Sequence, residues 1–444
     1  MTKPSEVDQV DQDDIVRARN ILLASGRRSP REEVDAYRVL VQVSPAVYLP
    51  RLARALRQLG HDRCYDDRPE ARLALFEEAV AVARAVDPAQ SSRADLLYEA
   101  LDWCQWQLYE VGRRAEGLVL RGEMLSIGRA RAESPGGGAV RGLDHPWATG
   151  LSEEGRYAEA ADALTESVAR QRSAGRGEDG FAWTVLQWIA ALDAAGRPAE
   201  ALTAMRELVD MKATQAANDR GPMACHLYVL IRYAQMLDSA ARPGEATAVR
   251  GEALALLTAL AVHGERKSWS GYQTAFWAVL FSVSGADSER PAPGAPRPPA
   301  GTDPLHWSPD TRRQYFRSLK TLRDEVDGLA LRAGANPDHL SELVRLQRVF
   351  TVRSTVHWRF RSHRAGQVRS LFDEGVDLAR RLLRYDADAG TRALATALTD
   401  RATFHVAAED FDTALADFRQ VPELLARQAD GVDGPATHRS GIEA

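Results

Sequence analysis

Residues whose types and spacing suit catalysis are scarce in this sequence of 444 residues. The closest pair of histidines, His357 and His363, is six residues apart, outside the i, i+4 spacing of a helical metal site. No His-Glu-x-x-His, Gly-x-Ser-x-Gly or Cys-x-x-Cys motif is present. Gly136, Gly137 and Gly138 are not followed by the Lys-Ser/Thr pair of a phosphate-binding loop. We therefore expect a protein without enzymatic activity, cofactor or metal.

A basic run is the clearest charge pattern. Residues 343–372 contain no Asp or Glu, and their arginines are Arg345, Arg348, Arg353, Arg359, Arg361, Arg364 and Arg369. Phe350, Trp358 and Phe360 lie between these arginines, which favours an anionic partner such as an acidic protein or nucleic acid. The equal alternative is compensation within the fold by two flanking acidic clusters. Their members are Asp324, Glu325 and Asp327 on one side and Asp373, Glu374 and Asp377 on the other.

Composition indicates a globular cytoplasmic protein. Hydrophobic residues make up 45% and charged residues 27% of the chain, which is typical of soluble domains. The most apolar run, Phe276–Val283, is far shorter than the roughly 18 residues that span a bilayer. Met1–Asp14 is polar and acidic, unlike a secretory signal. Cys64, Cys104 and Cys225 lie far apart, so we expect buried thiols in a reducing compartment.

A repeated string indicates which elements hold these residues. Its four copies are Gly112–Gly117, Gly155–Ala160, Gly196–Ala201 and Ala241–Ala246, at spacings of 43, 41 and 45 residues. Shorter or degenerate copies are 67–71 and 409–414. In three copies a glycine suits the left-handed end of one helix, and in three Pro or Tyr opens the next. In all four Glu lies in the first turn, and Ala allows close packing. The string therefore predicts repeated helix hairpins.

This turn resembles that of the tetratricopeptide repeat (TPR), with a period longer than the usual 34 residues. The best match is Gly155, Tyr157, Ala160 and Leu164, and a copy without the glycine is Phe411, Ala414 and Phe418. The resemblance implies an all-α, right-handed superhelical solenoid of antiparallel hairpins. HEAT-type helical repeats are the structural alternative.

Five segments are expected along the chain. Residues 1–44 form a polar tail and capping helices, the second of which is opened by Ser29, Pro30 and Glu32. Residues 45–284 and 308–428 form helical repeats. The proline-rich residues 285–307 are expected to be an exposed loop, and deletion of Arg290–Asp303 is expected to leave the thermal unfolding midpoint almost unchanged. Residues 429–444 are expected to be disordered.

The TPR resemblance further implies that the first helix of each hairpin lines a concave groove. The implied groove residues are Glu99, Asp102, Trp106, Tyr109, His145, Thr149, Trp183, Asp193, Tyr228, Gln235 and Asp238. Aromatic rings and carboxylates together suit a peptide with cationic and apolar groups. Alternatively, Trp106 and Trp183 simply pack between helices. We expect a scaffold or adaptor that binds a protein or peptide, with a ligand- or peptide-responsive regulatory sensor as the alternative.

Overall fold

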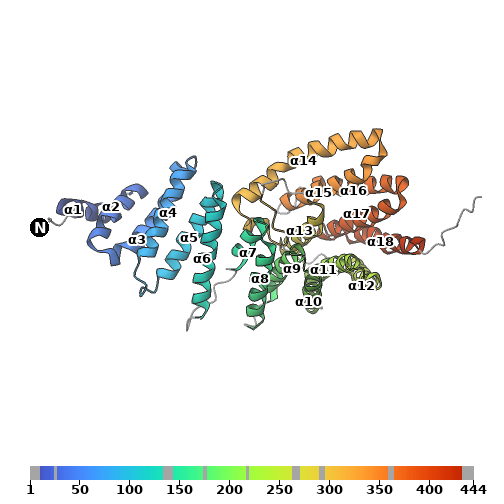
Figure 1. The fold of residues 1–444 in the computed structure, drawn as a ribbon, viewed down its shortest axis with the longest axis horizontal. Helices are drawn as coiled ribbons and strands as arrows, with labels where there is room; N and C mark the ends of the chain where they lie inside the picture. The colour runs from blue at the N-terminus through green and yellow to red at the C-terminus, as the bar shows by residue number, and fades with distance from the viewer. Residues whose placement is uncertain are drawn as a thin grey trace, which may run out of the picture. The chain divides into compact units, whose positions relative to one another are not determined.

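The computed structural model describes residues 11–24, 28–133, 144–173, 178–216, 220–262, 271–289, 296–358 and 365–432. These residues form 18 α-helices and four 3-10 helices, and no strand occurs among them (Figure 1). The all-α fold predicted from the sequence is therefore confirmed. The chain divides into two compact units. Unit 1 is Met1–Leu151 with Ser308–Asp310, and unit 2 is Ser152–Trp307 with Thr311–Ala444.

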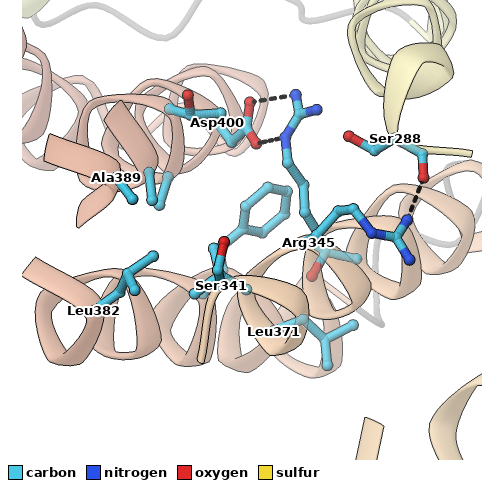
Figure 2. Close-up of a pocket in the computed structure, with 15 residues that line it drawn as sticks. Ser288, Ser341, Arg345, Leu371, Leu382, Ala389 and Asp400 are labelled. Carbon is cyan, nitrogen blue, oxygen red and sulfur yellow. Dashed lines mark hydrogen bonds and ion pairs between the residues drawn. The ribbon is translucent and has the colours of Figure 1, made fainter. Parts of the chain in front are cut away.

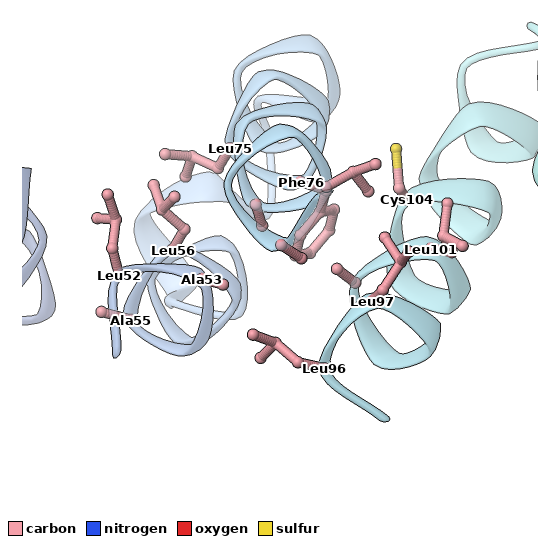
Figure 3. Packing of buried hydrophobic residues seen from close by; sticks show 14 of the residues in the cluster. Leu52, Ala53, Ala55, Leu56, Leu75, Phe76, Leu96, Leu97, Leu101 and Cys104 are labelled. Atoms are coloured by element: carbon pink, nitrogen blue, oxygen red, sulfur yellow. The ribbon is translucent and has the colours of Figure 1, made fainter. Parts of the chain in front are cut away.

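Unit 1 consists of helices of which the first six pack one against the next along the chain. They are α1 (Gln12–Leu23), α2 (Pro30–Val43), α3 (Pro45–Gly60), α4 (Pro69–Ala85), α5 (Arg93–Glu110), α6 (Arg114–Glu133) and most of α7 (Asp144–Glu153). Helix α2 begins as predicted, because Ser29 Oγ accepts from Glu32 N and Glu32 Oε2 accepts from Ser29 N. Leucines of α3 and α5 meet Phe76 of α4 in the core of unit 1 (Figure 3).

Unit 2 contains the remaining helices. They are α8 (Tyr157–Ser173), α9 (Glu178–Ala194), α10 (Pro198–Ala216), α11 (Arg220–Ser239), α12 (Pro243–Val262), α13 (Gly271–Gly285), α14 (Pro309–Ala335), α15 (Leu340–Trp358), α16 (Ala365–Tyr385), α17 (Ala387–Ala407) and α18 (Phe411–Val432). Sequential neighbours pack as hairpins from α8 to α12 and from α15 to α18. Helix α18 extends to Val432, so the expectation that the chain is disordered from residue 429 is wrong for residues 429–432. Residues 433–444 lie outside the described part of the chain.

The repeated string encodes the hairpin turns. Gly112, Gly155 and Gly196 have φ angles of 81°, 73° and 74°, and Ala241 and Glu409 occupy the same left-handed region at 55° and 60°. In four of these turns the backbone N–H of the residue after the left-handed one donates to a carbonyl five residues earlier, at the end of the preceding helix. These bonds are Arg113 N to Leu108 O, Arg197 N to Leu192 O, Arg242 N to Leu237 O and Asp410 N to His405 O, at 2.8 to 2.9 Å. The positions predicted for the turns are thus confirmed.

In two copies of the string, the arginine at the second position bonds to the helix that follows the turn and to a helix of the preceding hairpin, which was not expected from the sequence. Arg113 Nε donates to Glu116 Oε1 at 2.7 Å, within the first turn of α6. Its Nη1 donates to Glu77 of α4 at 2.9 Å. Arg197 repeats this arrangement with Glu200 and with Asp162 of α8. One side chain therefore fixes the start of a helix and links it to the preceding hairpin.

Helix α13 lies at the centre of unit 2 rather than at its surface. It packs against α11, α15 and α17, and its six residues from Phe276 to Phe281 are all buried. Trp277 joins Phe281, Phe372 and Phe404 in one aromatic cluster, with ring centroids 4.8 to 6.4 Å apart. Side chains of unit 2 that the resemblance placed in an open groove are therefore in part covered by this helix.

The prediction that the proline-rich segment is exposed is wrong for much of residues 296–307, one of its two described parts. Arg297 N donates to the carbonyl of Glu153 at 3.0 Å. Gly301, at φ 77°, lies against α9 so closely that a Cβ there would be 2.8 Å from the Leu186 carbonyl. Trp307 is 1% exposed, and its Nε1 donates to Thr302 O at 3.0 Å. Local composition indicated a loop but contained no sign of the helix surface that receives it.

Two further expectations concern the cysteines and the membrane. Cys104 and Cys225 are buried free thiols, as expected, whereas Cys64 is exposed. Among the helices of the described ranges, none combines the length and the apolar character needed to cross a bilayer.

Candidate functional site

Helix α5 has one buried and one accessible face. Its buried face consists of Leu96, Leu97, Ala100, Leu101, Cys104, Gln105, Gln107, Leu108 and Tyr109. The accessible positions from Asp95 to the end of the helix, which we call the α5 stripe, are Asp95, Tyr98, Glu99, Asp102, Trp103, Trp106 and Glu110. Their spacing of three or four residues places them along one side of the helix. Every member of the α5 stripe is an acid or an aromatic residue.

Two buried side chains, Gln105 and Arg121, fix the position of the Asp102 carboxylate. Gln105 Nε2 donates to Asp102 Oδ1 at 3.2 Å, and Arg121 Nε donates to Gln105 Oε1 at 3.0 Å. Gln105 and Arg121 are each 2% exposed. Burial raises the pKa of Asp102, and the Gln105 hydrogen bond and the charge of Arg121 only partly oppose this effect. The carboxylate is thus fixed in position, although its charged form is poorly solvated.

Aromatic side chains flank Asp102 along the α5 stripe. The Trp103 side chain is 39% exposed, and its ring meets that of His61 edge-on at 4.2 Å. Burial, with a smaller effect from the Asp102 charge, raises the pKa of Tyr98 to about 12, so its hydroxyl stays neutral. Trp106 is half-buried. The surface therefore offers both apolar area and a fixed negative charge.

Two carboxylates of the α5 stripe already have cationic partners in unit 1. Glu99 Oε2 lies 3.2 Å from Arg57 Nη1 of α3, and Asp95 is ion-paired with Arg131 of α6. The one hydrogen bond found for the Asp102 side chain among the described residues comes from the neutral amide of Gln105. Asp102 is accordingly the member of the α5 stripe best placed to accept a cation.

Tyr109 and Thr149 are buried and do not lie on an open groove. Tyr109 is fully buried, with the guanidinium groups of Arg121 and Arg114 at 4.3 and 5.1 Å from its ring centroid. Thr149 is also fully buried, and His145 is half-buried. Only Tyr109 was placed on the wrong side of α5, where the accessible position is Glu110, and the accessible Trp103 was missed. Its signal was present, because Trp103 lies three and four residues from Trp106 and Glu99.

The groove residues expected on α9 and α11 are dispersed. Trp183 packs edge-on against Tyr272 and Phe276 of α13, with centroids 5.7 and 5.5 Å away. Tyr228 is 2% exposed, and burial raises its pKa well above the ordinary value. Tyr228 therefore belongs to the core of unit 2, and the half-buried Trp183 packs against α13.

The three polar residues of that set are more accessible. Asp193 lies 3.9 Å from Arg232 and lines a cavity of about 310 Å³ beside the proline-rich segment. Asp238 is ion-paired with Arg250 of α12, and Gln235 Oε1 lies 3.5 Å from Arg232 Nη1. Each is engaged with a neighbouring arginine, and they do not form one surface with Trp183 or Tyr228.

The described arginines of the basic run are compensated inside unit 2, so they do not form a free basic surface. Arg345 binds both carboxylate oxygens of Glu342 at 2.7 and 2.8 Å. Arg348 and Arg353 are paired with Asp400 and Glu289. The compensating acids differ from the flanking clusters proposed from the sequence. Arg359, Arg361 and Arg364 lie outside the described residues.

Comparison with known proteins gives structural similarity only. No protein-family model and no curated protein matches the sequence. A solved structure of kinesin light chain TPR-like repeats from Podosopora anserina matches 49% of this chain and all of its own, with 19% identity and a TM-score of 0.36. BtubC from P. vanneervenii matches 57% of this chain and 95% of its own, with 15% identity and a TM-score of 0.36.

A third solved structure, of Naa15/Naa10 bound to HypK-THB, matches 94% of this chain and 64% of its own, with 9% identity and a TM-score of 0.34. Among the described residues, no group of three or more His, Cys, Asp or Glu side chains is arranged to hold a metal ion. Among these solved structures to which the all-α chain of helix hairpins is similar, the kinesin light chain repeats are TPR-like.

Proposed function

We propose that the chain is a non-catalytic scaffold whose α5 stripe binds a segment of a partner protein that carries a Lys or Arg beside an apolar residue. The observation that carries this proposal is Asp102, a carboxylate fixed by Gln105 and Arg121, with a raised pKa and with Trp103 and Trp106 beside it. A partner cation would pair with Asp102 directly, whereas Arg121 is linked to it only through Gln105.

The chemistry of the α5 stripe favours a cation with an apolar stem. A carboxylate–cation hydrogen bond is stronger than a neutral one, and aromatic faces attract cations. The methylene groups of Lys or Arg would cover part of the exposed Trp103 ring while the charged end reaches Asp102. Anionic partners are disfavoured, since all charged members of the α5 stripe are acids.

Selection of a random peptide display library on the immobilised full chain tests the proposal. We expect the selected peptides to share a Lys or Arg next to an aromatic or aliphatic residue, and we expect Asp102→Asn to weaken their binding in calorimetry. Glu123→Gln is the matched control, because Glu123 is an acid of unit 1 outside the α5 stripe that pairs with Arg84. Selection of acidic peptides, or equal binding by Asp102→Asn and the wild type, would refute the proposal.

A further inference from the structure

A separate cavity of about 290 Å³ lies in unit 2 between α15, α16 and α17 (Figure 2). Helix α16 packs against both α15 and α17, whereas α15 and α17 touch each other little, which leaves space between them. Four of the residues that line this space are small, namely Gly375, Ala389, Ala393 and Ala397. A Cβ at Gly375 would meet no atom within 4 Å. The space therefore follows from small residues on α16 and α17.

The cavity has an apolar part and a polar end. Figure 2 shows Leu382 and Ala389 together on one side, with Ser288 and the arginine bonded to it on the other. Val344, Leu371 and Phe372 add to the apolar wall. A molecule that fills this space must therefore carry an apolar body and a polar group at one end.

Arg345 is the group able to bind that polar end. Of its five N–H donors, two bind Glu342 and one binds the Ser288 carbonyl at 2.5 Å, and no acceptor is found for the other two among the described residues. Its side chain is 25% exposed, so a ligand can reach it. Both carboxylates near this end are already bound by arginines. Asp400, the one acid of the lining, is bound by Arg348 through Nε and Nη2, and Glu342 is bound by Arg345 through Nε and Nη2.

We propose that this cavity binds a small monocarboxylic acid with an unbranched apolar tail, its carboxylate on Arg345 and its tail along the apolar wall. Guanidinium is the side chain best matched to a carboxylate, which explains the choice of an acid over an alcohol. At about 30 Å³ for each heavy atom, the volume per molecule of liquid water, the cavity holds about ten heavy atoms. An eight-carbon acid has this size.

Titration calorimetry with octanoate, octan-1-ol and octylamine on the full chain tests the proposal. We expect octanoate to bind, the alcohol to bind at least about tenfold more weakly, and the amine to show no binding. Octanoate that fails to bind at millimolar concentration, or an alcohol that binds equally well, would overturn the assignment of an acid.

Three variants locate the ligand. Gly375→Leu fills the cavity at a position with open space and should abolish octanoate binding while the chain stays folded by circular dichroism. Arg345→Gln should lower octanoate affinity about tenfold and remove the preference over the alcohol. Arg380→Gln, an exposed arginine of α16 paired with Asp377, should change neither. Unchanged binding by Gly375→Leu would exclude this cavity, even if Arg345→Gln does not fold.

Discussion

Arg353 of α15 and Glu289, just beyond the 3-10 helix that follows α13, form a largely buried ion pair. Arg353 Nε lies 2.9 Å from Glu289 Oε1, and the two side chains are 15% and 12% exposed. The guanidinium also lies 4.8 Å from the ring centroid of Tyr315 on α14 and donates to Ser318 Oγ at 2.6 Å. One arginine of the basic run thus joins three segments of unit 2.

Arg353→Ala should destabilise unit 2 by about 3 kcal/mol, because it leaves the Glu289 carboxylate buried without its cation. Thermal unfolding followed by calorimetry measures the loss. Arg380→Ala removes an exposed pair on α16 and should cost less than about 0.5 kcal/mol. If the Arg353 variant instead unfolds like the wild type but loses binding to an anionic partner, the arginine serves recognition rather than stability.

Ala241→Gly should stabilise the chain by about 1 kcal/mol, since Ala241 is held at a φ of 55°, where a Cβ is strained. The reverse change in the equivalent turn, Gly196→Ala, should destabilise by a similar amount, because Gly196 has a φ of 74°. Chemical denaturation of the two variants beside the wild type measures both effects. Shifts of the same sign in the two variants would show that the turns do not share one backbone conformation.

Gly301→Ala should lower the free energy of unfolding by about 2 kcal/mol, because alanine is strained at φ 77° and its Cβ would collide with the Leu186 carbonyl. Deletion of residues 296–303 should likewise lower the midpoint of thermal unfolding, the opposite of what proline content alone predicts. Gly334→Ala, on the surface at the end of α14 where a Cβ meets nothing within 4 Å, is the control. A midpoint unchanged by the deletion would show that the segment contributes no stability.

The Asp102→Asn and Trp106→Ala double variant should weaken binding of a peptide selected on the α5 stripe by about 2 kcal/mol, on the order of 30-fold. Calorimetric titration of the folded variant gives this value. Glu123→Gln should bind as the wild type does. Full affinity in the double variant would place the peptide elsewhere on the chain.

Asp102→Asn alone should make the chain more stable at neutral pH while it weakens binding. The raised pKa of Asp102 means that the folded chain holds this proton more tightly than the unfolded chain does, so its ionisation disfavours folding as pH rises. Asparagine keeps the acceptor for Gln105 and carries no charge. The gain in midpoint should vanish as pH falls below about 3.9, where aspartate is protonated in both states. A variant less stable than the wild type at pH 7 would contradict this assignment.

The hairpins could be read from the sequence because their determinants are local. The left-handed position, the helix-opening residue and the first-turn Glu all lie within the six residues of one string, and even the degenerate copy places Glu409 at a φ of 60°. The α5 stripe was found in part for the same reason, since Glu99, Asp102 and Trp106 share a helical period.

What the sequence did not reveal depends on residues far apart in the chain. Trp183 is covered by α13, Arg348 is neutralised by Asp400, and Gly301 rests on α9. No local pattern specifies such pairs. One signal was nevertheless present, because the run Phe276–Val283 is apolar on every side of a helix, as expected for a helix buried all round.

The central place of α13 has a consequence for synthesis on the ribosome. Helices of unit 1 find their neighbours within one hairpin, so they can pack as they emerge. Helix α13 must wait for α17, which begins roughly a hundred residues later, a delay of about 5 to 20 s at ordinary elongation rates. During that interval Phe276, Trp277 and Phe281 lack part of their final cover. We expect nascent unit 2, and not unit 1, to recruit chaperones.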